Sequence, residues 1–203
     1  TGYGRNAIRF ADTTITEITC HARGIHHLMP ATRSIIEIGG QDSKFITLEA
    51  GGRVRDFSMN DRCAAGSGRF LEVVASRLGV TLPALGEMSA KSEKPALISS
   101  MCVVFAETEI IGLLTEGVPP PDIAAGVQNA IAQRVLALAG RSINPPVCFT
   151  GGVALQSGMV RALNAALSLP VEIPSQPQYT GALGAAVLAG RMKDGKAPLS
   201  ASI

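Results

Sequence analysis

The chain has 203 residues, of which 46% are apolar and only 4% aromatic, and its formal net charge is +2. This length is enough for a buried aliphatic core in one domain or somewhat more than one. The lysines and arginines are scattered, which excludes a basic stripe for nucleic acid, and no apolar run approaches the roughly 20 residues that cross a bilayer.

The first third of the chain predicts one helix and a β-meander. The helix is expected over Thr13–Met29, because proline follows it directly. Three β-rich runs come next, with glycine turns between them. The predicted strands are Ser34–Ile38, Lys44–Glu49 and Val54–Met59.

The middle of the chain is predicted to be helical. Apolar residues recur at helical spacing in three segments, and three consecutive prolines then break the pattern before Asp122, which is expected to cap a fourth helix. The predicted helices are Ala64–Leu78, Leu82–Ala90, Met101–Thr115 and a last one that ends near Ala139.

The last third alternates strands and helices. This βαβα order predicts parallel strands with crossover helices and hence an α/β fold. The segments are strand Pro146–Thr150, helix Gln156–Leu167, strand Val171–Ile173 and helix Gly181–Met192, followed by a tail.

Two glycine pairs lie directly after predicted strands. Gly39 and Gly40 follow the first strand, and Gly151 and Gly152 follow Thr150. Glycine lets backbone approach a phosphate or nucleoside closely, and the N–H groups of a turn form an anion-binding concavity. Each pair taken alone is also what an ordinary turn looks like.

Polar residues beside the first pair suit nucleotide chemistry. Asp42 is suited to hold Mg²⁺ through water, and Gln41 to orient an attacking water. A third glycine set, formed by Gly66, Ser67 and Gly68, opens a predicted helix and offers further N–H donors. The chain contains neither GxxxxGK[ST] nor GxGxxG, which disfavours a P-loop or Rossmann site.

Cys63 and Cys102 each stand at a predicted helix start, just after polar capping residues. Exposed N–H groups and the helix dipole stabilise a thiolate there, so each is a candidate metal ligand or reactive thiol. An iron–sulfur cluster usually takes four cysteines, and a symmetric pair of chains would supply them. Buried structural thiols remain the alternative.

Other chemical side chains have simpler interpretations. Cys20, beside His21 and before two further histidines, lacks the ligand spacing of a zinc site and is expected to pack in its helix. Cys148 is expected to be a small buried hydrophobe in a strand. Glu107 and Glu109 face different sides of their helix, so one is expected near a nucleotide and the other in solvent.

Taken together, the motifs resemble those of the ATPase activators of 2-hydroxyacyl-CoA dehydratases and the related ATPase subunits of benzoyl-CoA reductases. Six motifs follow one another in the same order as in that family: TGYGRN, IGGQDSKF, MNDRCAAGSGRFLE, ISSMCVVFAETE, TGGVA and GALGAA. The resemblance covers residues 1 to about 192. It implies a ribonuclease-H-like, actin-like ATPase fold, with a mixed sheet flanked by helices and an incomplete first half.

The resemblance also implies ligands for individual residues. Cys63 and Cys102 would ligate a [4Fe–4S] cluster shared by two subunits of a homodimer. Gly40, Gln41 and Asp42 would face the β- and γ-phosphates of ATP and Mg²⁺, and Gly151 and Gly152 would face the nucleoside.

One family element has no counterpart here, since the first phosphate loop, of the type GxDxGST, would lie upstream of TGYGR. We expect this gap to reflect truncation. The expected division is residues 1–33 as a remnant of the N-terminal lobe, 34–180 as the second ribonuclease-H-like lobe with the cluster-binding helices, and 181–203 as a C-terminal helix and tail.

The hypothesis from sequence is therefore ATP-driven transfer of one electron. A reduced ferredoxin or flavodoxin would load the cluster, and an acyl-CoA dehydratase or reductase would receive the electron. Coupling requires that the nucleotide state change the surroundings of the cluster. Two alternatives stay open: a small-molecule kinase of the same superfamily, and a non-catalytic nucleotide-binding module.

The cysteines also bear on where the protein works. All four are widely spaced, and no CxxC pair occurs. A chain of this length does not depend on disulfides, so we expect a reducing cytoplasm. The chain opens at Thr1 without a signal-peptide pattern, and we expect its true N-terminus to be missing.

Overall fold

A computed structural model describes residues 1–2, 4–61, 64–99, 103–140 and 143–193. Four strands form one mixed sheet in the order β3-β2-β1-β4. Its strands are β1 (Ser34–Ile38), β2 (Ser43–Leu48), β3 (Val54–Asn60) and β4 (Val147–Thr150). β1 pairs antiparallel with β2 and parallel with β4, and β2 pairs antiparallel with β3.

Helices account for most of the remaining described chain. The α-helices are α1 (Glu17–Leu28), α2 (Gly68–Arg77), α3 (Leu82–Ser89), α4 (Val103–Thr115), α5 (Pro120–Ala139), α6 (Ser157–Leu167) and α7 (Thr180–Lys193). Short 3₁₀ turns are η1 (Arg5–Ala7), η2 (Ala64–Gly66), η3 (Gly152–Leu155) and η4 (Pro177–Tyr179). Within the described chain, no helix has the length and apolar character needed to cross a membrane.

The sheet separates two apolar clusters, because successive strand residues point to opposite faces. Ile36 pairs with Phe45 and Phe149 and faces the larger cluster, which includes residues of α2, α5 and α6. Ile35 pairs with Ile46 and faces the smaller cluster under α1. Central β1 is therefore buried on both sides.

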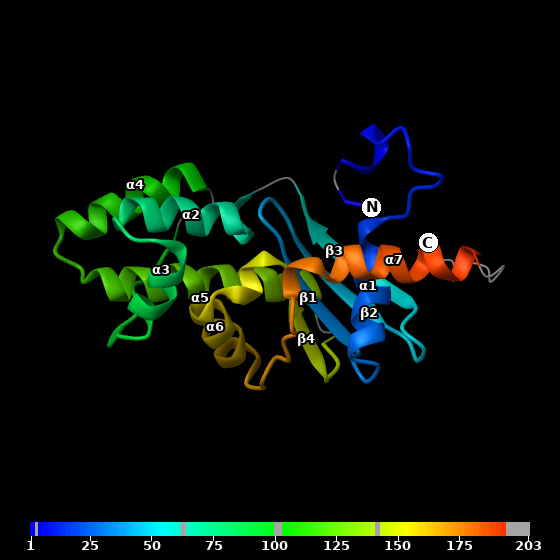
Figure 1. The fold of residues 1–203 in the computed structure, drawn as a ribbon. Helices are drawn as coiled ribbons and strands as arrows, with labels where there is room; N and C mark the ends of the chain where they lie inside the picture. Colours follow the sequence, from blue (N-terminus) through cyan, green and yellow to red (C-terminus); the bar gives the residue numbers. More distant parts are fainter. Residues whose placement is uncertain (3, 62–63, 100–102, 141–142, 194–203) are drawn as a thin grey trace.

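α1 and α7 lie side by side along the sheet, whereas α2–α5 extend away from it (Figure 1). Glycines allow the close contact between α1 and α7. A Cβ at Gly24 would overlap the carbonyl oxygen of Thr180, and one at Gly184 would overlap the carbonyl oxygen of Cys20. The two helices come from opposite ends of the described chain, and α1 packs on the smaller apolar cluster of the sheet.

Most predicted elements are present with ends shifted by one or two residues, and three segments differ more. α1 begins only at Glu17, because extended Thr16 is its N-cap and accepts a hydrogen bond from the Thr19 N–H. The helix predicted over Ala64–Leu78 starts as a 3₁₀ turn, and α2 follows extended Ser67. The segment predicted as strand Val171–Ile173 forms only a single parallel bridge, between Glu172 and Cys148.

Asp122 was expected to cap the helix through Ala139, and this prediction was wrong. Pro119 is the N-cap, and Asp122 lies within the first turn of α5. Its carboxylate instead accepts hydrogen bonds from the Ser92 hydroxyl (2.6 Å) and from the N–H groups of Glu93 and Lys94 (both 3.1 Å). These bonds, the one from Ser92 first, lower the pKa of Asp122.

Candidate functional site

Two glycine turns meet at the carboxyl ends of neighbouring parallel strands. Turn 39–42 follows β1, and turn 151–152 follows β4. Gly151 has φ +88°, and a Cβ there would overlap the carbonyl oxygen of Ile38. Only glycine permits this backbone conformation together with this contact. The two pairs that were singled out from the sequence are therefore neighbours in space.

The third glycine set brings the start of α2 onto turn 39–42. The Gly68 N–H donates to the Gly39 carbonyl (2.8 Å), and the Arg69 N–H donates to the Gly40 carbonyl (2.9 Å). A Cβ at Gly68 would lie 3.1 Å from Val153 Cγ2 and 3.2 Å from the Gly39 carbonyl oxygen, so any larger residue would have to push helix and turn slightly apart. These two N–H donors are thus used within the protein, where they hold helix and turn together.

A cavity of about 200 Å³ lies where the three motifs converge. Its glycine lining comes from all three: Gly39, Gly40, Gly68 and Gly152. No atom lies within 4 Å of where a Cβ of Gly40 or Gly152 would be. Both positions therefore expose bare backbone to open space, as a cradle for a closely bound ligand requires.

The other lining residues were not recognised from the sequence. Leu71, Leu82 and Val153 supply apolar walls, and Glu72 and Gln156 supply polar groups. Glu72 is paired with Arg69 at 2.8 Å. Leu71 and Val153 belong to the buried core, so periodicity alone could not separate them from other core residues.

The remaining predicted site residues lie around this cavity. Gln41 is exposed and Asp42 half-buried, both in turn 39–42. Gly66 and Ser67 are buried and do not line the cavity; the Ser67 hydroxyl donates to the Ala64 carbonyl (2.7 Å).

A buried ionic cluster behind the turns was also missed. The Lys44 ammonium lies 2.8 Å from both Glu37 Oε2 and Asp42 Oδ2, and 3.5 Å from Glu17 Oε1. Lys44 and Glu37 are only 1% and 4% exposed at their side chains. They are register partners on β1 and β2, so two opposite charges in strands otherwise rich in apolar residues were the available sequence signal.

Burial and charge shift the pKa values of this cluster in different directions. Burial opposes the charged form of Lys44, but the Glu37 and Asp42 carboxylates outweigh it and raise the pKa of Lys44. Burial raises the pKa of Glu37. Interaction with His21, followed by that with Lys44, lowers the pKa of Glu17 to about 2 against the effect of burial.

A hydroxyl chain continues from this cluster to turn 151–152. His21 Nε2 lies 3.7 Å from Glu17 Oε1, and His21 Nδ1 is hydrogen-bonded to Thr180 Oγ1 (2.9 Å). Thr180 Oγ1 is bonded in turn to Thr150 Oγ1 (2.9 Å), which donates to the Pro177 carbonyl (2.8 Å). The buried polar groups behind the two turns are thus connected.

The predicted cluster ligands, Cys63 and Cys102, lie outside the described residues. The other two cysteines are fully buried. Burial raises the pKa of Cys20, and it raises the pKa of Cys148 to about 12. In the part of the chain that the structure describes, no group of three or more His, Cys, Asp or Glu could hold a metal ion.

Glu107 and Glu109 have protein partners of their own. Glu107 pairs with Arg77, which joins α4 to α2. Glu109 accepts hydrogen bonds from the Ser99 N–H (2.8 Å) and hydroxyl (2.7 Å). Neither lines the cavity between the glycine turns.

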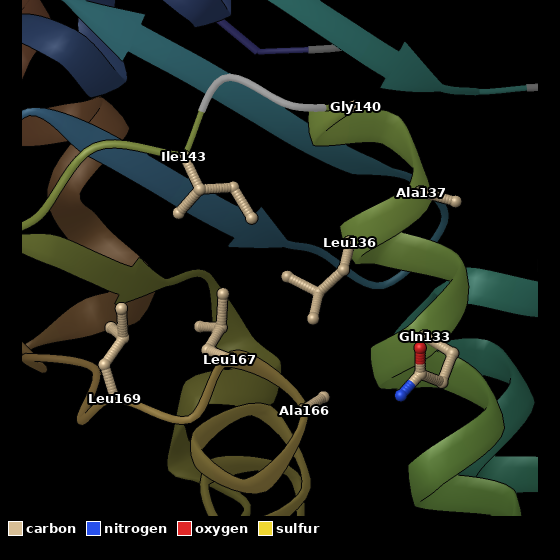
Figure 2. Close-up of a pocket in the computed structure, with 8 residues that line it drawn as sticks. All are labelled: Gln133, Leu136, Ala137, Gly140, Ile143, Ala166, Leu167 and Leu169. Carbon is tan, nitrogen blue, oxygen red and sulfur yellow. The ribbon is translucent and has the colours of Figure 1, made fainter.

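A larger cavity of about 520 Å³ lies elsewhere, between the ends of α5 and α6. Figure 2 shows Leu136, Ile143, Leu167 and Leu169 around it. Gln133 contributes a side-chain amide to the lining of this cavity. None of the residues predicted for a site lines it. It is an open surface depression whose side chains, apart from Gln133, are aliphatic.

The chain is similar in sequence to several known proteins. The chain is 47% identical over 190 residues to the 2-hydroxyisocaproyl-CoA dehydratase activator of Clostridioides difficile, covering 93% of this chain and 71% of the relative. It is 46% identical over 191 residues to the (R)-2-hydroxyglutaryl-CoA dehydratase activating ATPase of Acidaminococcus fermentans, covering 93% of this chain and 73% of the relative. A benzoyl-CoA reductase component of Thauera aromatica is 33% identical over 196 residues, covering 92% of this chain and 68% of the relative.

The fold has a close solved counterpart. The structure of the activator of the 2-hydroxyisocaproyl-CoA dehydratase from Clostridium difficile, solved with bound ADPNP, matches with a TM-score of 0.90 and 44% identity, over 98% of this chain and 76% of that one. The expected α/β, actin-like ATPase fold is thereby confirmed. The model of the BadF/BadG/BcrA/BcrD ATPase family matches residues 1–189, and the chain belongs to this family.

Proposed function

We propose that this chain binds and hydrolyses ATP between its glycine turns and thereby activates an acyl-CoA dehydratase or reductase by transfer of one electron. The observation that carries the proposal is the meeting of three separate glycine motifs at one cavity. Relatives that share most of its length are named as dehydratase activators and as part of a reductase, and a solved relative binds ADPNP.

The cavity has the features needed for part of a nucleotide. Its glycines present backbone, and its apolar walls suit a base or ribose, with the Gln156 amide as a polar partner. Its volume of about 200 Å³ is smaller than the roughly 300–1,000 Å³ typical of whole-ligand pockets. We therefore propose that this cavity holds only part of the ATP molecule, namely the part that lies between turn 39–42 and turn 151–152.

The residues of turn 39–42 supply the hydrolytic groups in this proposal. Exposed Gln41 orients the attacking water, and Asp42 holds Mg²⁺ through water. Gly40 and Gly152 bring bare backbone to the phosphates and the nucleoside, respectively. Gln41 and Asp42 lie beside the cavity rather than in its lining, whose own carboxylate and amide are those of Glu72 and Gln156.

Cys63 and Cys102 are the proposed ligands of a [4Fe–4S] cluster. The chemistry of the donor set supports them, because burial disfavours the thiolates of Cys20 and Cys148, and thiolate is the form that binds iron. Two cysteines per chain call for a second copy of the chain, hence the proposed homodimer. The cluster, when bound, would supply the electron, taken from a ferredoxin or flavodoxin.

The described residues link turn 39–42 to both segments that flank Cys63. Ser43, directly after the turn, pairs with Asn60 at the end of β3. On the other side of Cys63, the first N–H groups of α2 bond the carbonyls of Gly39 and Gly40. α2 and α4, joined through Arg77 and Glu107, both begin at the ends nearer the sheet (Figure 1). A nucleotide that moves turn 39–42 would therefore also move the end of β3 and the start of α2, the segments that flank Cys63.

Filling the cavity without disturbing the fold tests nucleotide binding. Leucine at Gly152 has open space, so Gly152→Leu should leave the free energy of unfolding nearly unchanged while raising the Kd for ATP about tenfold or more. Gly190→Leu is the matched control, since Gly190 is an exposed glycine with equal space in α7. Titration calorimetry with Mg-ATP measures both variants.

The results separate the alternatives. Unchanged ATP affinity in Gly152→Leu would refute the assigned site. Phosphate transfer from ATP to a small acceptor by an iron-free wild-type protein would favour a kinase, and ATP binding without hydrolysis would favour a non-catalytic module.

A further inference from the structure

Lys44 occupies an unusual place, because its ammonium is surrounded by three carboxylates from three elements. Glu37 belongs to β1, Asp42 to turn 39–42 and Glu17 to α1. Its side chain is 1% exposed, and it is among the largest fully buried side chains of the described chain. A buried lysine is costly unless it is paired, and here three carboxylates lie within 3.5 Å of the ammonium, so charge contacts rather than volume define the surroundings of Lys44.

Glu37 places this lysine between the two glycine turns. A Cβ at Gly39 would lie 3.3 Å from Glu37 Oε1, and one at Gly151 only 2.7 Å from it. The Glu37 carboxylate is thus packed against both turns at once. Lys44 connects it to Asp42, whose own carbonyl accepts the Gly39 N–H (3.0 Å) and closes turn 39–42.

A second route joins the same two turns through α1 and α7. It runs from Lys44 through Glu17 and His21 to Thr180 and Thr150. It ends at the Pro177 carbonyl, which accepts the Thr150 hydroxyl (2.8 Å) and also the Gly151 N–H (3.0 Å). The Gly151 N–H of turn 151–152 and the Asp42 carboxylate of turn 39–42 therefore belong to one connected polar network.

We propose that Lys44 is a positioning residue that holds Asp42, and with it turn 39–42, in a fixed place relative to turn 151–152. The proposal rests on the proposed ATP site. Lys44 itself does not line the cavity, so its task is alignment of the hydrolytic groups rather than nucleotide binding. Replacing a buried ion pair by apolar side chains of similar volume is often neutral or stabilising, so we expect the fold to tolerate the loss of this pair.

The test compares the wild-type chain with the double variant Glu37→Leu/Lys44→Met, which removes Lys44 together with its most deeply buried carboxylate; Asp42 and Glu17, which lose the ammonium as partner, are 24% and 28% exposed at their side chains and stay in contact with water. The variant should melt cooperatively and bind Mg-ATP with a Kd within about threefold of wild type, while kcat falls about tenfold or more because Asp42 is no longer held. Lys91→Met, at an exposed lysine, is the matched control and should leave both quantities unchanged. The single variant Lys44→Arg keeps the positive charge, so its kcat should lie between that of the double variant and that of wild type.

Hydrogen exchange without nucleotide supplies a readout that is independent of hydrolysis. Amides of residues 37–44 should exchange faster in the double variant than in wild type, and those of α5 should not change. A double variant that fails to fold, or one with wild-type kcat and wild-type exchange in residues 37–44, would overturn the positioning role. Failure of the wild type itself to bind or hydrolyse ATP would instead refute the proposed function.

Discussion

At the scale of single residues, the ionic cluster around Lys44, behind the glycine turns, shifts the pKa values of its members. Glu17 shows the consequence, since its contacts with His21 and Lys44 lower its pKa to about 2. A carboxylate whose pKa is lowered in the folded state stabilises the protein above its unfolded pKa. That contribution is lost as the pH falls from the unfolded pKa toward the folded one.

Glu17→Gln should therefore flatten the acid limb of the stability curve. With a folded pKa of about 2 and an unfolded value of about 4.3, the wild type should lose about 2.5 kcal/mol more than the variant between pH 5 and pH 2. Urea unfolding followed by circular dichroism at several pH values measures this difference. Parallel curves for the two proteins would show that Glu17 is not stabilised by this network.

The glycine pairs after β1 and β4 were recognisable from the sequence as turns, and at Gly151 the positive φ and the contact with the Ile38 carbonyl oxygen require glycine. The roles assigned to these glycines stay predictions. Glu37 and Lys44 were not recognised, since a charge within a strand shows its partner only when the register of β1 and β2 is known. Asp122 was misassigned for a similar reason, as its partners lie in the loop before α4 rather than in its own helix.

At the scale of elements, the contact between α1 and α7 brings the two ends of the described chain together over the sheet. The contact depends on backbone approach at Gly24 and Gly184, which nothing in the local sequence pattern reveals. It also carries His21 and Thr180, the link to turn 151–152. Helix packing and site alignment therefore depend on the same glycines.

Gly184→Ala should separate the two helices, because the added Cβ would overlap the Cys20 carbonyl oxygen. We expect a loss of about 1–3 kcal/mol in the free energy of unfolding. Gly190→Ala, in the same helix but with open space, should be neutral or stabilising by up to about 1 kcal/mol. Equal melting temperatures for the two variants would contradict the tight crossing.

The sequence periodicity predicted the type of most helices and strands correctly. The errors lie in segments whose structure depends on contacts with other parts of the chain. Residues around Val171–Ile173 have strand character, yet only Glu172 reaches Cys148 in a bridge. The start of α2 was placed too early because extended Ser67 interrupts an otherwise helical pattern. That interruption sets Gly68 against turn 39–42, so the deviation is itself part of the site.

At the scale of the whole molecule, the proposal joins two functions that lie in different segments. The cavity that we propose for the nucleotide was predictable as a set of turns, but its apolar walls became visible only when α2, α3 and the segment after β4 were brought together. The expected division into residues 1–33, 34–180 and 181–203 stays a prediction. The assignment of Cys63 and Cys102 likewise rests on motif and chemistry.

The central claim is that each chain contributes Cys63 and Cys102 to one cluster shared by two subunits, and the iron content of anaerobically purified protein tests it most directly. We predict roughly two iron atoms per chain in the wild type, as a four-iron cluster shared by two chains requires. Iron should be lost in Cys63→Ala and in Cys102→Ala, but kept in the matched control Cys20→Ala. Iron retained by either of the first two variants, or an iron-free wild type, would contradict the account.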